Sequence, residues 1–374
     1  MVEWKKLGEL GTFENIGTDK KIVEGEDIVT LLNYIDVYHH KYIDSSVPQM
    51  QVSASNKKIA DCTVEKGDIF VTPSSETLDD IGHSSVITET ITNAVYSYHI
   101  MRYRLFEKNM LLSYYINYSF DTDNVKRQIL KKAQGLTRFG LSKDKFASIL
   151  IPIPSLSEQQ RIVGILDTFT ASIDNLKEQI AQRRKQYEYY RDQLLDLEGK
   201  EGVEMKTLGE SCLIRTGSKP AEILDKGRYC YINAGTTESG YVNESNCDCD
   251  VVTTPSRGQG GIGFVGYQRN DFWLGPLCYQ IRPNKKENFK SKYLFYYLSS
   301  HSEEILKYKS EGGTPAVNAV DLKKIQIHLP PLQEQQRIVS ILDTFEASIQ
   351  NLEAQLSQRE KQYEYYRNKL LTFE

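Results

Sequence analysis

The sequence contains two copies of one long stretch. Residues 151–195 align with residues 327–371 at a constant offset of 176 without a gap, and 31 of the 45 aligned pairs are identical. Identity at this level indicates an internal duplication and therefore a two-part architecture. A recent duplication would explain the repeat without function, and two identical surfaces that bind two copies of one partner would explain it as well. Several positions expected at the surface are repeated too, namely Gln159, Gln160, Arg161, Asp167, Thr168, Gln182, Lys185 and Glu188.

Both copies have the apolar periodicity of a coiled coil. Apolar residues follow alternating steps of four and three, which keeps one stripe facing a partner helix over about five heptads. Arg183 and Arg359 interrupt the stripes, and two tyrosines and a leucine then resume each of them in phase. We expect the coiled-coil seam to consist of Ile162, Leu166, Phe169, Ile173, Leu176, Ile180, Ile338, Leu342, Phe345, Ile349, Leu352 and Leu356.

Each copy is expected to form one helix of about 38 residues, which is about 57 Å at 1.5 Å per residue. Pro154 and Pro330 precede the helices, and Ser157 with Gln160 has the form of a capping box. Gln333 takes the cap position in the second copy, where the cap is weaker. Two helices that share a seam are expected to pair antiparallel across a pseudo-twofold axis, with one globular part at each end.

The rest of the chain divides into two related globular parts. Val2–Glu9 and Val203–Glu210 begin these parts with similar sequences, and the short polar segment 196–202 is typical of a linker. In each part, strand-like runs alternate with a tyrosine-rich helical stretch, which favours a mixed α+β domain. One of the expected strands covers Val95–Tyr103. The boundaries, in the order globular, helical, globular, helical, are 1–155, 156–198, 199–331 and 332–374.

Composition restricts the classes of function. The 374 residues suffice for two or three domains, and 40% hydrophobic with 26% charged residues is typical of globular proteins. The formal net charge of −4 and a pI near 6.0 are unusual for a protein that binds nucleic acid alone, because such proteins have a basic face. If the chain binds nucleic acid, either its basic patch is local or a partner contributes much of the phosphate contact.

The cysteines and the N-terminus indicate a cytoplasmic protein. The six cysteines are scattered and contain no C-x-x-C pair, so we expect free thiols in a reducing compartment and no metal site. The first residues do not resemble a signal peptide, and no apolar run approaches 18 residues. We therefore expect a chain that is soluble, stays in the cytoplasm and does not contact a membrane.

A glycine-rich segment matches a nucleotide-binding pattern but lacks its context. Gly258–Gly263 fits G-x-G-x-x-G, which in dinucleotide-binding folds is followed by a helix. A strand-like run, Phe264–Tyr267, follows instead, so we interpret the segment as a mobile loop whose backbone approaches another molecule closely. The sequence has no phosphate-binding loop, no H-E-x-x-H zinc motif, no Asp/Asn-Pro-Pro-Tyr/Phe methyltransferase motif and no marked carboxylate pair. These absences argue against an enzyme.

Recognition of nucleic acid is the remaining interpretation. Arg257 and Gln259 lie in the flexible loop, and their side chains suit bidentate contacts with guanine and adenine edges, respectively. The polar run Thr72–Ser84 fits a loop that enters a groove, and its acidic residues can accept a hydrogen bond from cytosine N4 or simply keep the loop soluble. Each arginine could equally be ordinary solvated surface. The candidate DNA-binding residues are Thr72, Ser74, Ser75, Arg138, Arg215, Ser256, Arg257, Gln259 and Gly260.

The whole chain resembles the specificity (S) subunit of a Type I restriction–modification system. The resemblance is carried by two copies of Leu-x-Glu-Gln-Gln-Arg-Ile-Val-x-Ile-Leu-Asp, at Leu156–Asp167 and Leu332–Asp343, each after an Ile/Leu-Pro-x-Leu exit from a variable part. It implies that 1–155 and 199–331 are target recognition domains, each recognising one half of a bipartite, asymmetric sequence in double-stranded DNA. The spacers 156–198 and 332–374 would set the spacing and dock methyltransferase subunits.

The resemblance also implies the partners and cofactors. Two methyltransferase (modification) subunits would bring S-adenosylmethionine, and two restriction subunits would bring ATP- and magnesium-dependent translocation and cleavage. The chain itself would bind no cofactor and catalyse nothing. Two alternatives stay open: a duplicated coiled-coil adaptor whose globular ends bind protein partners, and a specificity chain that serves a fused restriction–methylation enzyme. Salt- and sequence-dependent DNA binding by the assembled complex would distinguish a specificity subunit from an adaptor. Neighbouring reading frames would distinguish a fused enzyme from a separate three-subunit system.

Overall fold

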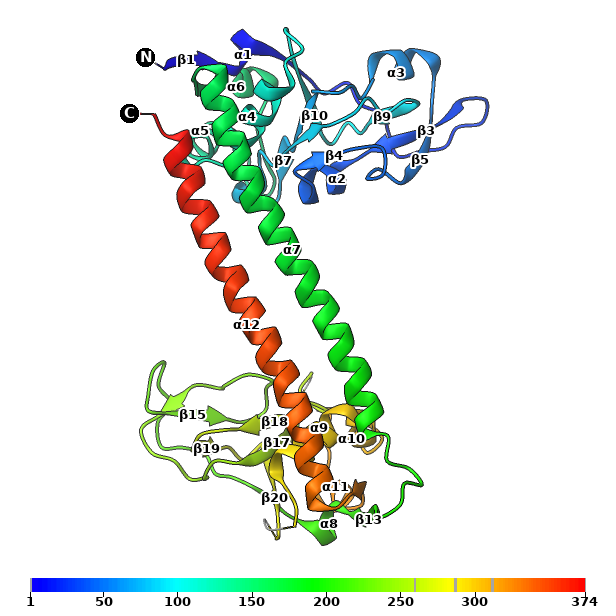
Figure 1. Cartoon of the computed structure of the whole chain (residues 1–374), viewed down its shortest axis with the longest axis vertical. Helices are drawn as coiled ribbons and strands as arrows, with labels where there is room; N and C mark the ends of the chain where they lie inside the picture. Colours follow the sequence, from blue (N-terminus) through cyan, green and yellow to red (C-terminus); the bar gives the residue numbers. More distant parts are fainter. Residues whose placement is uncertain (1, 259, 286–287, 311–312, 374) are drawn as a thin grey trace. The chain divides into compact units, whose positions relative to one another are not determined.

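The chain forms two compact units in the computed structural model, which describes residues 2–258, 260–285, 288–310 and 313–373. Unit 1 comprises Met1–Leu176 with Gln355–Glu374, and unit 2 comprises Lys177–Ala354. Each unit therefore contains one globular part and a segment of each of two long helices, α7 and α12 (Figure 1). Among the described residues, no helix is both long and apolar enough to cross a membrane.

Unit 1 has a mixed α+β fold. A five-stranded sheet has the order β2-β10-β6-β8-β4, a three-stranded sheet the order β5-β3-β9, and β1-β12 and β11-β7 form two short ladders. The elements are β1 (Glu3–Lys6), α1 (Leu7–Leu10), β2 (Gly11–Glu14), β3 (Asp27–Leu32), α2 (Tyr34–His39), β4 (Tyr42–Ile43), β5 (Met50–Ala54), α3 (Asn56–Asp61), β6 (Ile69–Val71), β7 (Ser74–Ser75), the 3-10 helix η1 (Leu78–Asp80), β8 (Ser84–Ile87), β9 (Ala94–Tyr96), β10 (Met101–Leu105), α4 (Met110–Phe120), α5 (Asp123–Lys132), β11 (Phe139–Gly140), α6 (Lys143–Ala147), β12 (Leu150–Ile153) and α7 (Leu156–Leu195).

Unit 2 repeats most of this topology, with four strands in its main sheet instead of five. Its sheets have the orders β14-β20-β17-β18 and β16-β15-β19, with β13-β21 as a short ladder. The parallel pair β15–β19 corresponds to β3–β9 of unit 1. The elements are β13 (Glu204–Thr207), α8 (Leu208–Ser211), β14 (Cys212–Thr216), β15 (Tyr229–Ile232), β16 (Tyr241–Val242), β17 (Val251–Pro255), β18 (Gly266–Gln268), β19 (Trp273–Leu274), β20 (Cys278–Pro283), α9 (Ser291–Ser300), α10 (Ser302–Leu306), α11 (Ala319–Leu322), β21 (Gln326–Leu329) and α12 (Leu332–Leu371).

The α+β class and the internal repeat are confirmed, but one predicted strand is wrong. The run Val95–Tyr103 is not a single strand, because β9 and β10 are separated by a turn in which the backbone N–H of Ile100 donates to the carbonyl of Ser97 at 3.1 Å. The two strands belong to different sheets. The intervening residues contain no glycine or proline, so the turn leaves no mark in the sequence.

The predicted helix caps also need correction. Helix α7 begins at Leu156, and its cap is Ser155, whose Oγ accepts from the backbone N–H of Glu158 at 3.4 Å. Ser157 and Gln333 lie inside the first turns of α7 and α12 and do not cap them. The serines at 155 and 157 both fit the cap pattern, and only the point where the chain leaves β12 decides between them.

A tyrosine-rich helix in each unit connects its sheet to the long helices. In unit 1, Tyr115 of α4 donates through its hydroxyl to the carbonyl of Pro152 at 2.8 Å, and Tyr118 donates to Asp167 Oδ1 at 2.6 Å. In unit 2, Tyr293 of α9 donates to the carbonyl of His328 at 2.6 Å, and Tyr296 donates to Asp343 Oδ1 at 2.5 Å. The residue numbers of the corresponding acceptors differ by 176, which is the offset of the sequence repeat. The duplication therefore preserves these contacts.

The two long helices pack on each other within each unit. In unit 1, the first half of α7 lies against the end of α12, and Phe169 stacks on Tyr366 with ring centroids 5.5 Å apart. In unit 2, the end of α7 lies against the first half of α12, and Tyr190 stacks on Phe345 at the same distance. The pairing is therefore antiparallel. The guanidinium groups that interrupt the seam lie over these rings, Arg359 over Phe169 and Arg183 over Phe345.

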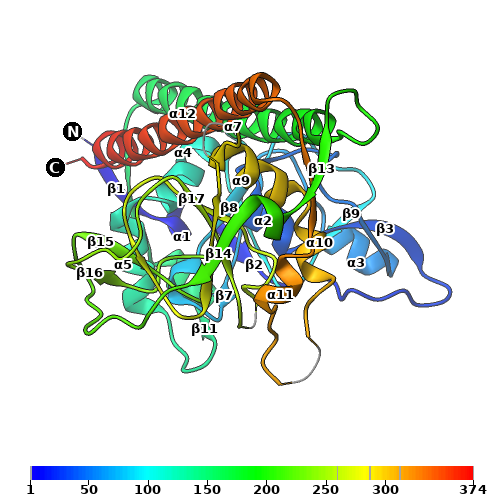
Figure 2. The same ribbon diagram turned by 90° about the horizontal axis from the view of Figure 1, so that it is seen from below.

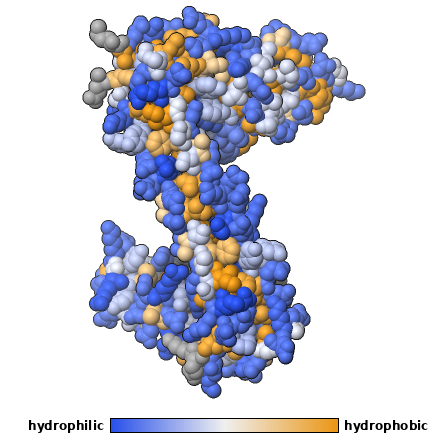
Figure 3. Space-filling model, viewed as in Figure 1, coloured by the Kyte–Doolittle hydropathy of each residue, from blue (hydrophilic) through white to orange (hydrophobic). Residues whose placement is uncertain are grey.

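None of the twelve predicted seam residues is exposed. Six are buried: Ile162, Leu166, Ile173, Ile180, Ile338 and Leu342. The other six are partly buried: Phe169, Leu176, Phe345, Ile349, Leu352 and Leu356. In contrast, Gln159, expected at the surface, is 3% exposed because its Nε2 donates to the carbonyl of Pro154 at 2.9 Å. The face shown in Figure 3 is mostly hydrophilic, with apolar side chains scattered among blue ones.

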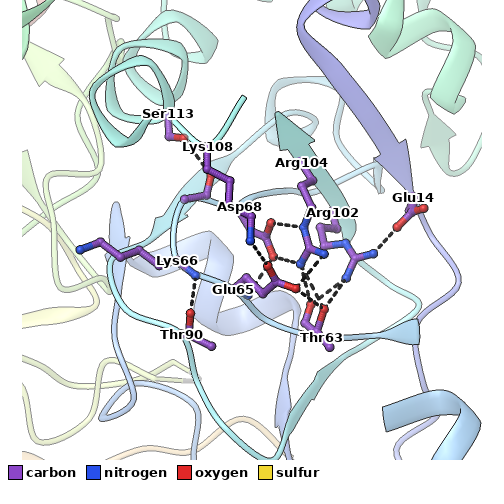
Figure 4. A network of polar contacts seen from close by, with 11 residues as sticks. Glu14, Thr63, Glu65, Lys66, Asp68, Thr90, Arg102, Arg104, Lys108 and Ser113 are labelled. Carbon is purple, nitrogen blue, oxygen red and sulfur yellow. Dashed lines mark hydrogen bonds and ion pairs between the residues drawn. The ribbon is translucent and has the colours of Figure 1, made fainter. Parts of the chain in front are cut away.

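A polar network anchors β10 of unit 1 (Figure 4). Arg104 makes two parallel hydrogen bonds to Asp68, from Nε to Oδ1 and from Nη2 to Oδ2, both at 2.6 Å. Asp68 is 2% exposed, and burial raises its pKa, an effect that the hydrogen bonds from Arg104 partly offset. Arg102 on the same strand pairs with Glu14 and donates to the carbonyl of Thr63. The network holds the loop before β6 in place.

Candidate nucleic-acid interface

Three of the four predicted DNA-binding residues of unit 1, namely Ser74, Ser75 and Arg138, meet at a short ladder. Strand β7 pairs antiparallel with β11, so that Ser75 lies opposite Phe139 and Ser74 opposite Gly140. Arg138 directly precedes β11, is exposed, and places its Nη2 at 3.4 Å from Ser74 Oγ. Residues 64 positions apart are thus neighbours. Figure 2 shows β7 and β11 next to each other.

Gly135 makes the turn before Arg138 possible. Its φ is +142°, and a Cβ at this position would lie 1.9 Å from the carbonyl oxygen of Arg138. The backbones of Gln134 and Gly140 close the turn with two mutual hydrogen bonds of 2.8 and 3.0 Å. A glycine is therefore required for the tight loop that presents the arginine.

Thr72 lies beneath this loop instead of on its surface. It is fully buried, and its Oγ1 accepts from the backbone N–H of His83 and donates to the carbonyl of Asp80, each at 3.0 Å. Because the hydroxyl is used on both sides, Thr72 connects the two ends of the polar run. Thr72 is therefore placed to support the loop.

A cleft of about 410 Å³ opens beside the ladder, and we call it the α2 cleft. Tyr34 and Tyr38 lie one turn apart on α2, with ring centroids 5.9 Å from each other. Asn33 caps this helix in a capping box with Asp36, which fixes its first turn. The lining residues are Tyr34, Ile35, Tyr38, Ser74, Ser75, Glu76, Thr77, Asp80, His99 and Arg138.

Asp80 is one of two acidic residues of the α2 cleft, the other being Glu76. The Asp80 carboxylate accepts from the hydroxyl of Thr77 and, at 3.2 Å, from the hydroxyl of Tyr38. The hydrogen bond from Thr77 is the largest cause that lowers the pKa of Asp80, so the group is ionised at neutral pH. Burial raises the pKa of Tyr34, with Asp80 adding to the rise and Arg138 opposing it, so both charges act on that hydroxyl.

Unit 2 has a corresponding ladder at the end of β17. Ser256 is 9% exposed, and Arg257, which follows it, is exposed and bridges antiparallel to Ala316. The backbone N–H of Gly258 donates to the carbonyl of Pro315 at 3.0 Å. Gly260 is exposed with φ +81°, and no atom lies within 4 Å of the place of a Cβ. Gln259 lies outside the described residues.

Arg215 does not belong to this ladder. It is an exposed residue of β14, opposite Gln280 of β20, which in turn lies opposite Thr253 of β17. The strand order places it two strands away from β17, so Arg215 and Arg257 belong to different parts of the unit 2 surface. The glycine-rich segment is followed by β18 and not by a helix, so the dinucleotide interpretation has no structural support.

The arginine of the ladder lies on opposite segments in the two units. In unit 1 it precedes the second segment, β11, whereas in unit 2 it belongs to the first segment, directly after β17. Sequence analysis found both arginines but missed Tyr34 and Tyr38 as members of the site. A helix cap at Asn33 followed by tyrosines four residues apart was the available signal, although nothing local connects it with residue 138.

The outward side of the long helices is the second candidate interface. The repeated polar pairs that are exposed in both copies include Gln160/Gln336, Arg161/Arg337, Thr168/Thr344, Gln182/Gln358, Lys185/Lys361 and Glu188/Glu364. Both threonines return their hydroxyls to the helix, Thr168 to the carbonyl of Gly164 at 2.9 Å and Thr344 to that of Ser340 at 2.7 Å. Within the described ranges, no group of three or more His, Cys, Asp or Glu residues could hold a metal ion.

Comparisons with known proteins agree on one family. The family model of the type I restriction modification DNA specificity domain matches residues 1–183 and 200–360. The EcoR124I/EcoR124II type I restriction enzyme specificity subunit of Escherichia coli is 32% identical over 260 residues, which cover 60% of this chain and 63% of that subunit. A putative type I restriction enzyme specificity subunit of Haemophilus influenzae is 32% identical over 268 residues, covering 64% and 68%. The match thus spans less than two thirds of the E. coli subunit.

Two solved structures have a similar fold. The S subunit of a type I restriction–modification system from M. genitalium matches with a TM-score of 0.65, 17% identity, and coverage of 100% of this chain and 97% of that one. A chain from a structural study of complex assembly and conformational transition of the type I R-M system matches with a TM-score of 0.58, 18% identity, and coverage of 99% and 96%. At 17% and 18% sequence identity, these matches show a similar fold and no more.

Proposed function

The chain belongs to the family of type I restriction–modification DNA specificity proteins, and from this premise we propose that it recognises a bipartite, asymmetric DNA target with one unit per half-site. The observation that carries the proposal is the pair of ladders. Two units of the same topology present an exposed arginine at the same place, but from opposite segments. Arginine is the side chain most often used to contact guanine in the major groove. Because the arginine lies on a different segment in each unit, we expect the two units to recognise different half-site sequences.

The repeated face of the long helices supports the proposed docking of two methyltransferase subunits. In unit 2, Gln336, Ser340 and Thr344 line a groove of about 810 Å³ together with Lys290 and Lys292 at the start of α9. Gln160, Gly164 and Thr168 are the corresponding residues of unit 1. A surface that occurs twice with almost the same residues suits two copies of one partner.

The division of labour in the complex is part of the same proposal. The chain supplies sequence recognition, and the methyltransferase subunits supply S-adenosylmethionine and the transfer of its methyl group. Restriction subunits supply the ATP- and magnesium-dependent steps. A net charge of −4 is compatible with this arrangement if the partners make much of the phosphate contact, which is the salt-dependent part of affinity. Two helices of 40 residues each are the elements that would fix the gap between half-sites.

Methylome sequencing tests the proposed function. A host that expresses the chain together with its modification subunit is expected to show one bipartite, asymmetric methylated-adenine motif. The motif should disappear when the chain is deleted and the modification subunit is kept. If a folded and assembled complex produces no new motif, the proposal is wrong, and a protein-binding adaptor becomes the better account.

A further inference from the structure

The α2 cleft contains a donor group whose capacity is largely unused inside the protein. The guanidinium of Arg138 has five N–H donors, and the contact of Nη2 with Ser74 Oγ is long at 3.4 Å. No carboxylate among the described residues forms an ion pair with it, in contrast to Arg102 and Arg104 of the same unit. Gly135 and the β7–β11 ladder hold the backbone on both sides of Arg138, so the side chain extends from a fixed base.

The same cleft contains an acceptor group that is fixed as an anion. Asp80 receives hydroxyl donors from Thr77 and Tyr38, and His83 Nε2 lies 3.7 Å from its Oδ1. A carboxylate offers about four lone-pair sites, so these contacts leave capacity for an external donor. About a third of the Asp80 side chain is exposed, at 34%. The aromatic residues Tyr34 and Tyr38 line the same cleft, as does a second carboxylate, that of Glu76.

A guanidinium fork of donors and a carboxylate acceptor that line one cleft match one kind of base pair. In the major groove, guanine presents two adjacent acceptors, O6 and N7, and the paired cytosine presents the N4 amino donor. Adenine and thymine present no two adjacent acceptors, because the N6 amino group lies between N7 and O4. A guanidinium that binds in a bidentate manner therefore selects guanine, and a nearby carboxylate satisfies the cytosine.

We propose that the α2 cleft recognises one G·C base pair of the first half-site, with Arg138 donating to guanine O6 and N7 and Asp80 accepting from cytosine N4. This inference rests on the proposed DNA-recognition function and adds the base pair and the residues to it. Tyr34 and Tyr38 are positioning residues, because Tyr38 holds Asp80 and Tyr34 lies close to both charges.

The test uses the complex of the full chain with its modification subunit. Methylation rates are measured on duplexes that carry the target, with all four base pairs substituted in turn at every position of both half-sites. Wild-type complex is expected to require G·C at one position of the first half-site. Arg138→Ala should lower the preference for that pair about tenfold or more while the preferences in the other half-site stay unchanged. Asp80→Asn should weaken the preference at the same position.

Two further variants distinguish base recognition from other roles. Arg138→Gln should shift the preference at that position towards A·T, because a glutamine amide is bidentate to adenine N6 and N7. Arg127→Ala, at an exposed arginine of α5 outside the cleft, is the matched control and should leave all preferences unchanged. Unchanged base preferences in the second half-site show that each variant complex is folded and assembled.

Three results would overturn the inference. If Arg138→Ala lowers the rate equally on all duplexes, Arg138 is a phosphate contact. If it leaves every preference intact, the cleft does not contact a base. In both cases the proposed function of the chain survives, because wild-type complex still methylates one bipartite target. If wild-type complex prefers no sequence, the proposed function fails and this inference fails with it.

Discussion

Asp167 and Asp343 show what the duplication has preserved at single positions. Each accepts a hydrogen bond from a tyrosine of the globular part of its own unit, Tyr118 or Tyr296. Gln159 and Gln335 likewise donate to the proline carbonyls at 154 and 330. The sequence pattern suggests that these polar residues lie at the surface, yet the aspartates bind each long helix to the tyrosine helix of its unit, and the glutamines bind the segment that enters the long helix. The repeated residues that stay exposed are therefore fewer than the sequence alone indicates.

The candidate DNA-binding residues differ in how well the sequence alone could predict them. Arg138, Arg257, Ser74 and Ser75 were found because their residue types suit contacts with bases. Thr72 and Ser256 have the same chemistry but are buried. Arg138 joins Ser74 only through the pairing of β7 with β11, and Tyr38 joins Asp80 only through a hydrogen bond between residues 42 positions apart, so both are long-range contacts. No local pattern in a sequence specifies such a contact, because side-chain periodicity describes one element at a time.

The Arg104–Asp68 pair is expected to matter for the stability of unit 1. Arg104→Ala removes both hydrogen bonds from a carboxylate that is 2% exposed. Breaking a buried pair from one side costs about 3 kcal/mol, because the carboxylate loses its cationic partner and keeps only the hydrogen bond from the backbone N–H of Glu65. Chemical denaturation of the purified chain measures the change in the free energy of unfolding.

Lys108→Ala is the control within the same network (Figure 4). The Lys108 side chain is 76% exposed, and its ion pair with Glu65 is expected to contribute less than about 1 kcal/mol. Equal losses for Arg104→Ala and Lys108→Ala would show that burial of Asp68 does not control the strength of the network.

The long helices were the most predictable elements of the chain. Their apolar stripes follow a 3.5-residue repeat, and the residues of the stripes are buried or partly buried as a seam requires. Arg183 and Arg359 look like interruptions in the sequence, but each covers the ring of a seam phenylalanine of the opposite helix. Short strands were less predictable. The run 95–103 forms two strands of different sheets, because a turn with no glycine or proline divides it.

Leu166 is expected to stabilise both the seam and the core of unit 1. The side chain is fully buried and belongs to the cluster that contains Leu371 of α12 and Tyr118 of α4. Leu166→Ala leaves a cavity and should lower the free energy of unfolding by about 2–5 kcal/mol. Urea denaturation followed by circular dichroism measures the loss.

Leu156→Ala makes the same chemical change in the same helix and is the control. Leu156 is 56% exposed at the first position of α7, so its loss should cost less than about 0.5 kcal/mol. A Leu166→Ala chain as stable as the Leu156→Ala chain would contradict the assignment of Leu166 to the core.

The two units share most of their secondary structure but differ in the loops that carry the candidate DNA-binding residues. Sheet order, the parallel strand pair, the tyrosine helix and the contacts to the long helices are shared. The loops at the ladders differ in length, in glycine content and in the segment that carries the arginine. The framework could be inferred from the duplication, because repeated residues must occupy equivalent places. The surfaces could not, because the segments that form them are the ones in which the two halves have diverged.

The claim that each unit recognises its own half-site is tested most directly by two arginine variants in parallel. Methylomes are sequenced for hosts that express the modification subunit with the wild-type chain, with Arg138→Ala or with Arg257→Ala. We predict that each variant relaxes the motif in one half only, and that the two variants affect different halves. Relaxation of the same half by both variants, or a uniform decrease in methylation at an unchanged motif, would contradict the account.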